Sequence, residues 1–215
     1  MRGEAFLDKP RLRGRLHQVA FFLSLPAGVG IVAAARTAGA RIGALVYAVS
    51  LSALYGASAL LHRLDWQPHM LRRMRQLDYS AIFVLIAGSN TAFAILVLNG
   101  PWRIGLLLTV WTGAAVGILL KLLHVDGFRV AVSTLYLFLG WVGILAAPIV
   151  LPQLGPLRAG LLAAGGILYT LGFLVLARRR PDPIPHVYGY YEVWHTAVVA
   201  ASACHYTLLL LLVLG

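Results

Sequence analysis

The sequence contains very little charge for its length. Only 12% of its 215 residues are Asp, Glu, Lys or Arg, whereas an average soluble domain has about 25%. Hydrophobic residues make up 60% of the chain, and the mean hydropathy is +0.82. A chain this apolar cannot cover its surface with groups that water solvates, and it is too apolar to stay disordered. The composition therefore excludes a soluble globular domain and indicates an integral membrane protein.

Cysteine and acidic residues are also scarce. The single cysteine, Cys204, excludes a small domain held together by disulfides. Seven acidic residues stand against 18 Lys and Arg, which gives a formal net charge of +11. Such an excess is typical of nucleic-acid-binding proteins, but here the positions of the basic residues favour membrane topology as its cause. We expect membrane lipids as partners and no nucleic acid.

Seven stretches of at least 17 residues contain no Asp, Glu, Lys or Arg. A helix needs about 20 apolar residues to cross the hydrocarbon core, with a range of roughly 17–25. Strands of a membrane barrel would alternate apolar and polar residues in segments of about 10, and these runs do not alternate. The sequence therefore predicts an all-α fold, a single membrane domain over residues 1–215 that is a bundle of seven transmembrane helices. The predicted spans are about 16–35, 42–62, 79–98, 104–120, 130–151, 159–177 and 193–214.

The basic residues predict the orientation, because Lys and Arg are enriched in cytoplasmic connectors. The N-terminal segment and the second, fourth and sixth connectors hold 14 of the 18, and the opposite side holds Arg36, Arg41, Arg103 and Arg158. We therefore expect a multi-pass protein of the cell membrane with its N-terminus in the cytoplasm and its C-terminus outside. The start of the chain also resembles a cleavable signal peptide, but its basic segment is long for one, which favours an uncleaved first span.

The longest connector, about residues 63–78, mixes arginines with Trp66, Met70 and Leu71. This mixture predicts a short amphipathic piece that lies in the headgroup layer.

Ionisable residues at membrane depth are costly, so each is a candidate functional residue. His62 ends the second predicted span, Asp78 begins the third, and His195 lies near the start of the seventh. All three helix ends are cytoplasmic in the predicted orientation, so the three side chains are expected at one depth. Ser58 lies one helical turn from His62 on the same helix face.

This combination fits a zinc site, because His and carboxylate ligands from separate helices bind Zn²⁺ and a catalytic zinc activates water. Asp78 could ligate the ion, or hold and deprotonate the water, and Ser58 could donate a hydrogen bond to a developing oxyanion. In a second interpretation these residues only cap wet helix ends or contact headgroups. The residue types alone leave both interpretations open.

The remaining histidines carry weaker signals. His205 lies about 15 Å further along its helix than His195, too far for both to bind one ion. The others are expected at interfaces or in loops, where a solvated histidine needs no special role; they are His17, His69, His124 and His186.

Several motifs resemble the hemolysin III family, the bacterial branch of the progestin and adipoQ receptor superfamily. The first are Ser58-Ala-Leu-Leu-His62 and the run Leu-Asp-Tyr-Ser-Ala-Ile-Phe-Val-Leu-Ile-Ala-Gly over residues 77–88. Ser-Thr-Leu-Tyr-Leu-Phe-Leu-Gly-Trp over residues 133–141 resembles the family's fifth span. Trp194-His195, followed by Ser-Ala-Cys-His over residues 202–205, resembles its seventh span.

The resemblance implies a zinc ion near the cytoplasmic face. In the receptor branch a histidine of the second span and two of the seventh bind it, and an aspartate of the third span holds a water at the metal. His62, His195 and Asp78 match those positions, and Ser58 matches a serine typical of the superfamily. The superfamily also includes the alkaline ceramidases, so the resemblance further implies hydrolysis of a lipid amide or ester.

One departure from the family pattern concerns a metal ligand. The seventh-span motif is His-x-x-x-His, and this chain has Tyr191-Glu-Val-Trp-His195. Tyr191 could serve as an oxygen ligand, or water could fill the position. Glu192 could ligate instead, since Glu at i and His at i+3 share a helix face in metal-binding bundles. Equally, the chain could have lost its metal.

Three functions remain open from the sequence. The first is a metal-dependent membrane hydrolase, and the second is a non-enzymatic sensor or regulator of membrane lipid homeostasis with a structural metal site. The third is a pore-forming cytolysin, for which Asn90 and His205 are the polar groups that could line a path.

Overall fold

The computed structural model describes residues 10–123 and 129–215, and within them the chain is helical with no β-strand. The predicted all-α class is confirmed. The elements are α1 (Arg15–Ala34), α2 (Ala38–Arg63), α3 (Pro68–Val97), α4 (Gly100–Leu122), α5 (Arg129–Trp141), the 3₁₀ helix η1 (Val142–Ala146), α6 (Ala147–Arg178) and α7 (Tyr190–Leu214).

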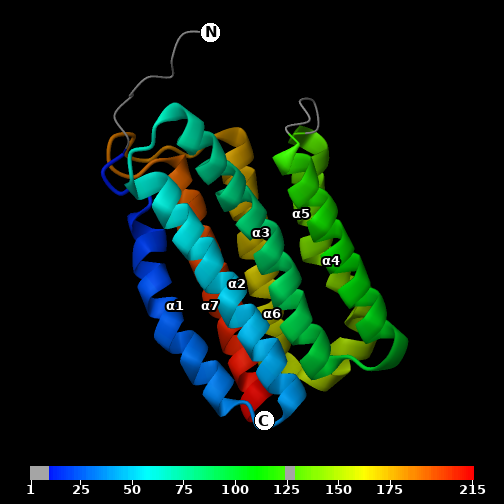
Figure 1. The fold of residues 1–215 in the computed structure, drawn as a ribbon. Helices are drawn as coiled ribbons and strands as arrows, with labels where there is room; N and C mark the ends of the chain where they lie inside the picture. Colours follow the sequence, from blue (N-terminus) through cyan, green and yellow to red (C-terminus); the bar gives the residue numbers. More distant parts are fainter. Residues whose placement is uncertain (1–9, 124–128) are drawn as a thin grey trace.

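The helices lie side by side in a bundle (Figure 1). The most extensive contacts join α2 to α3, α6 to α7 and α1 to α2, and α7 also contacts α1, α2 and α3. The start of α1 and the end of α7 lie at opposite ends of the bundle (Figure 1). The end of α2 and the starts of α1 and α7 therefore meet at one end.

Six helical segments of the described residues are long and apolar enough to cross a membrane. Five correspond to the first four predicted spans and the last one. The sixth, Val132–Arg178, has 47 residues and covers the two predicted spans 130–151 and 159–177. As one straight helix it would be about 70 Å long, more than twice the hydrocarbon core of about 30 Å. The predicted count of seven crossings stays a prediction.

The expected connector between those two spans is shorter than the sequence suggested. Helical structure continues on both sides of Gly155, which has φ 70° and ψ 168° and lies between Pro152 and Pro156. Glycine adopts this backbone conformation without the steric cost that a Cβ brings. A single non-helical residue therefore makes the break.

The third helix also begins earlier than expected, at Pro68 instead of residue 79. Proline suits the first position of a helix because its missing N–H would have no intrahelical partner there. The segment predicted as a separate amphipathic piece is thus continuous with α3. Asp78 consequently lies inside a helix, where its side chain is buried, and not at a helix end.

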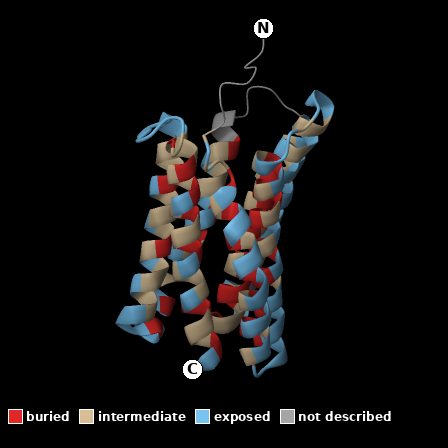
Figure 2. Cartoon of the chain, turned by 90° about the vertical axis from the view of Figure 1, so that its left-hand side faces the viewer, coloured by how far each residue is buried: buried red, intermediate tan, exposed pale blue. Residues whose placement is uncertain are grey.

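Apolar side chains cover much of the outside of the bundle, and small residues bring its helices together. Large exposed hydrophobic residues include Leu23, Val29 and Leu108, as expected for a surface in lipid. Exposed residues occur along the length of the bundle (Figure 2). A Cβ added at Gly28 would lie 2.9 Å from the Cβ of Ala48, so α1 and α2 approach closely there. Small residues allow such close packing of membrane helices.

Candidate functional site

Three histidines from three helices lie together where α1 and α7 begin and α2 ends. The rings of His17 on α1 and His195 on α7 are stacked, with centroids 4.0 Å apart and planes inclined by 27°. The ring of His62 on α2 lies 5.2 Å from that of His195, centroid to centroid. His62 and His195 are therefore neighbours, as the sequence predicted. We call these three residues the histidine cluster.

Two members of the cluster are almost completely enclosed. His17 is 3% exposed and His195 is 1% exposed. Both ring nitrogens of each are buried and have no hydrogen-bond partner among the described residues. Buried polar atoms are nearly always paired, and an unpaired one costs about 1–3 kcal/mol. Four unpaired nitrogens at one place indicate a site that takes a donor or acceptor from outside the chain.

Asp78 and Ser58 form a second buried polar group beside the cluster. The Ser58 hydroxyl interacts with the Asp78 carboxyl as a side-chain hydrogen-bond partner across the α2–α3 contact. Ser58 lies one turn before His62 on α2, and Asp78 is close enough to Tyr191 to interact with it electrostatically. The Ser58 hydroxyl is thus directed toward the Asp78 carboxyl.

Tyr191 stands beside the cluster with its ring close to two of the histidines. Its centroid lies 5.7 Å from that of His62 and 6.1 Å from that of His195. The guanidinium carbon of Arg13 lies 4.5 Å from the centre of the Tyr191 ring, an arrangement typical of a cation–π contact.

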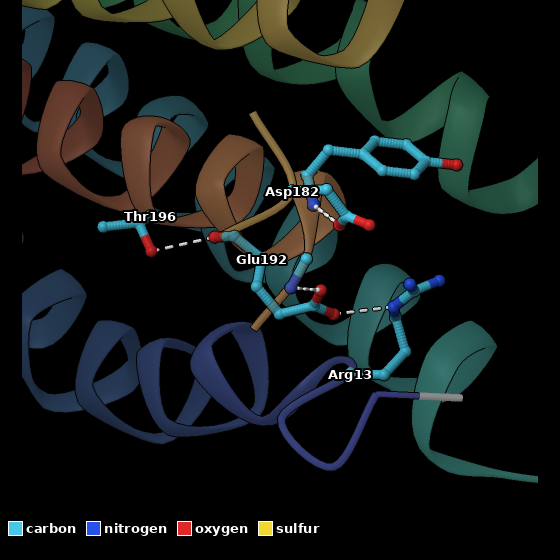
Figure 3. Close-up of polar contacts among 6 residues, drawn as sticks. Arg13, Asp182, Glu192 and Thr196 are labelled. Atoms are coloured by element: carbon cyan, nitrogen blue, oxygen red, sulfur yellow. Dashed lines mark hydrogen bonds and ion pairs between the residues drawn. The ribbon is translucent and has the colours of Figure 1, made fainter. Parts of the chain in front are cut away.

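Both carboxylate oxygens of Glu192 have protein partners. Its Oε1 accepts a hydrogen bond from Arg13 Nε at 2.6 Å, and its Oε2 accepts one from the backbone N–H of Gly189 at 2.9 Å (Figure 3). Glu192 therefore closes the first turn of α7 and pairs with Arg13.

The segment before α1 covers this end of the bundle. The backbone N–H groups of Arg11 and Leu12 donate to the carbonyls of His186 and Val187 at 3.0 and 3.2 Å. Gly14 caps α1 with φ 74°, and a Cβ added to it would lie 2.6 Å from the Cβ of His62. Glycine thus lets the start of α1 lie directly against the end of α2.

The donor types of the cluster suit zinc, and the spacing of one pair suits it as well. Zn–N bonds of about 2.0–2.1 Å at a tetrahedral angle put two imidazole centroids about 5 Å apart. The 5.2 Å between His62 and His195 agrees with that value. As the side chains stand, however, no group of three or more His, Cys, Asp or Glu in the described ranges forms a metal-holding set.

The other polar candidates lie elsewhere. His205 lies further along α7 than His195, and its Nε2 is 3.4 Å from the carbonyl oxygen of Leu162 on α6. The Asn90 side-chain amide donates to the Ile86 carbonyl of its own helix. His69 and His186 are exposed, as expected, and His124 lies outside the described residues.

The expectation for His17 was wrong, since this residue is buried and not solvated. A signal for it was present in the sequence. His17 falls inside the first charge-free stretch, so it is also an ionisable residue at membrane depth, which is the property that made His62 a candidate.

Comparison with known proteins agrees with the motifs. Residues 6–206 match the family described as Haemolysin-III related. Hemolysin-3 of Bacillus cereus is 35% identical over 201 residues, which cover 92% of this chain and 89% of the relative. The Hemolysin-3 homolog of Bacillus subtilis (strain 168) is 32% identical over 192 residues, 87% of this chain and 86% of the relative. The human Monocyte to macrophage differentiation factor is 28% identical over 194 residues, 86% of this chain and 77% of the relative. The chain therefore belongs to the haemolysin-III related family of membrane proteins.

Proposed function

We propose that this protein is a zinc-dependent hydrolase of a lipid amide or ester that works at the cytoplasmic end of a seven-span bundle in the cell membrane. The observation that carries the proposal is the approach of the His62 and His195 rings, from α2 and α7, to 5.2 Å between centroids. Asp78 is buried on α3 and interacts electrostatically with Tyr191 of α7, which supports its place beside them. Buried ionisable residues inside a membrane bundle are expensive to keep, which makes a functional role the first explanation for them.

The break at Gly155 supports seven crossings. Pro156 to Arg178 has about 23 residues, or about 35 Å of α-helix, enough for one crossing. Val132 to Leu154 has the same number of residues, divided among α5, the 3₁₀ helix η1 and the start of α6. Exposed arginines gather at the end where the histidine cluster lies; they include Arg63, Arg72, Arg73, Arg178, Arg179 and Arg180. The enrichment of basic residues on the cytoplasmic side assigns this end, and the N-terminus with it, to the cytoplasm.

His62 and His195 are the residues that would hold the ion, and Asp78 is the residue that would handle the proton. Zinc supplies a Lewis acid that polarises a carbonyl and makes water more acidic. The Asp78 carboxylate holds the attacking water and takes its proton. The hydroxyl of Ser58 fixes the orientation of that carboxylate. Because His195, Asp78 and Ser58 are buried, bulk water is kept away from them, which strengthens their electrostatic interactions.

Release of fatty acid by purified protein in lipid nanodiscs tests the proposal. The probes are an N-acyl sphingosine for the amide and a diacyl phospholipid for the ester, with products measured by mass spectrometry. The wild type should release fatty acid from one of them, and His62→Ala and Asp78→Asn should not. His69→Ala, which changes an exposed histidine outside the cluster, should keep the wild-type rate.

Elemental mass spectrometry of the same preparations tests the metal separately. We expect about one zinc per chain in the wild type and none in His62→Ala. Folded wild type that stays free of metal after dialysis against Zn²⁺ would overturn the metal site. Zinc-loaded wild type that cleaves neither lipid would overturn the hydrolase and leave a regulator with a structural metal.

A further inference from the structure

We infer that His17 of α1 is the third imidazole ligand of the metal site, in the role that Tyr191 leaves open on α7. The inference rests on the metal site of the proposed function and does not depend on hydrolysis. It extends the site to a third helix, so that α1, α2 and α7 each contribute one histidine.

The burial of His17 is the first argument. Its ring lies between the ring of His195 at 4.0 Å and that of Tyr55 at 5.2 Å, and neither of its nitrogens has a hydrogen-bond partner among the described residues. An apolar side chain would fill such a place without the cost of two unpaired polar atoms. A ligand for those nitrogens explains why an imidazole stands there.

The second argument is how firmly the chain positions His17. The backbone of Arg11 and Leu12 is hydrogen-bonded to the segment that precedes α7, and Arg13 is paired with Glu192 on α7. Gly14 then brings the first turn of α1 against His62. These contacts hold the start of α1 against α2 and α7, with the His17 ring stacked on that of His195.

The third argument is chemical. Zinc in proteins takes nitrogen from His, sulfur from Cys and oxygen from Asp or Glu, and a phenol is not among its usual ligands. Tyr191 offers a phenol under the Arg13 guanidinium, whereas His17 offers two nitrogens without partners. The exchange of ligand between α7 and α1 would keep the number of imidazoles at three.

The spacing of the rings defines what binding must change. His17 and His195 have centroids 4.0 Å apart, about 1 Å less than two imidazoles on one tetrahedral ion require. Binding therefore requires the His17 ring to turn out of its stack with the His195 ring, so that one nitrogen of each ring faces the same ion.

Zinc affinity, measured by competition with a chromophoric chelator on full-length protein in detergent, tests the inference. Loss of a mere supporting partner lowers metal affinity by about 10–100-fold, so removal of a direct ligand by His17→Ala should lower it by more than about 100-fold. His17→Cys should recover most of the affinity, because a thiolate is a zinc ligand. Tyr191→His should restore binding in the His17→Ala background, and His69→Ala should change nothing.

Thermal unfolding with and without Zn²⁺ provides a readout that a structural role would not move. Ligand binding to the folded state raises its Tm, so zinc should raise the Tm of the wild type and of His17→Cys but not that of His17→Ala. If His17→Ala does not fold, His17→Asn replaces it, since both Asn and Cys are small polar side chains and only Cys ligates zinc well.

The outcomes separate the inference from the proposed function. Wild-type affinity in His17→Ala or His17→Asn, with loss in His62→Ala, would overturn the role of His17 and leave the metal site standing. Loss of affinity that neither His17→Cys nor Tyr191→His restores would reduce His17 to a structural residue and overturn the inference. Wild type that binds no zinc would overturn both.

Discussion

Removal of Arg13 should destabilise the protein because it leaves the Glu192 carboxylate buried without its counter-ion. The Glu192 side chain is 1% exposed and that of Arg13 is 18% exposed, so the pair is screened mainly on the arginine side. Loss of one partner of a buried pair costs about 3–5 kcal/mol. Water has partial access at the Arg13 position, and the hydrogen bond from the Gly189 N–H to Glu192 remains. We therefore expect Arg13→Ala to cost about 3 kcal/mol, the lower end of that range. For a chain of this length that corresponds to a fall in Tm of about 6–12 °C.

The double variant Arg13→Ala/Glu192→Gln separates charge from packing. Both it and Arg13→Ala lose the contact of the guanidinium with the Tyr191 ring, but only the single variant keeps a buried charge. A Gln side-chain oxygen still accepts from Gly189, so the double variant should lose about 1–2 kcal/mol, less than the single one. The Tm of each variant in detergent, followed by tryptophan fluorescence, shows which of the two is less stable. Arg11→Ala, which removes an exposed arginine nearby, is the control. A double variant as unstable as Arg13→Ala would refute the buried-charge argument.

Further predictions follow from the close contacts of two glycines and from the proposed metal. Gly14→Ala should lower Tm more than Gly100→Ala, because both have positive φ but only Gly14 has a neighbour, His62, in the way of a Cβ; equal losses would contradict the contact. On α4, Gly117→Ala should destabilise through a clash with the Phe83 ring, while Gly105→Ala, which meets nothing, should gain up to about 1 kcal/mol from helix propensity. Their denaturation midpoints should move in opposite directions, and a shared direction would argue against the α3–α4 packing. Removal of zinc with a chelator should lower the Tm of the wild type and leave that of His62→Ala unchanged.

The sequence predicted the helices well because the bilayer sets a one-dimensional rule. A helix that crosses hydrocarbon has to exclude charge over about 20 residues, and that exclusion is visible in the order of residues alone. The rule says less about helix ends, where charged residues are tolerated. It therefore placed the start of the third helix at residue 79, although the structure continues the helix back to Pro68. The same rule missed that helical structure continues to both sides of Gly155.

The site was predictable only in part, since its residues meet through packing and not through spacing. His62 and His195 were expected at one depth because both lie near span ends, and the distribution of Lys and Arg puts those two ends on the same side of the membrane. The pairing of Arg13 with Glu192 joins residues 179 positions apart. It depends on which helix lies beside α7, and the charge and hydropathy patterns of the sequence do not predict which helices are neighbours. The partnership of Ser58 with Asp78 likewise depends on how α2 faces α3.

The error about His17 concerns how a histidine near a span end is judged to be solvated or buried. Arg13 and Arg15 precede His17 closely in the sequence, yet their side chains have different surroundings. Arg13 turns inward to a buried carboxylate, while Arg15 is exposed and His17, two residues on, is buried. A basic residue near a span end can therefore be part of the enclosed structure, and a histidine beside it is not thereby solvated. The charge-free stretch that contains His17 was the better guide, because it begins at residue 16 and the cost of burying an imidazole without a partner applies from there inward.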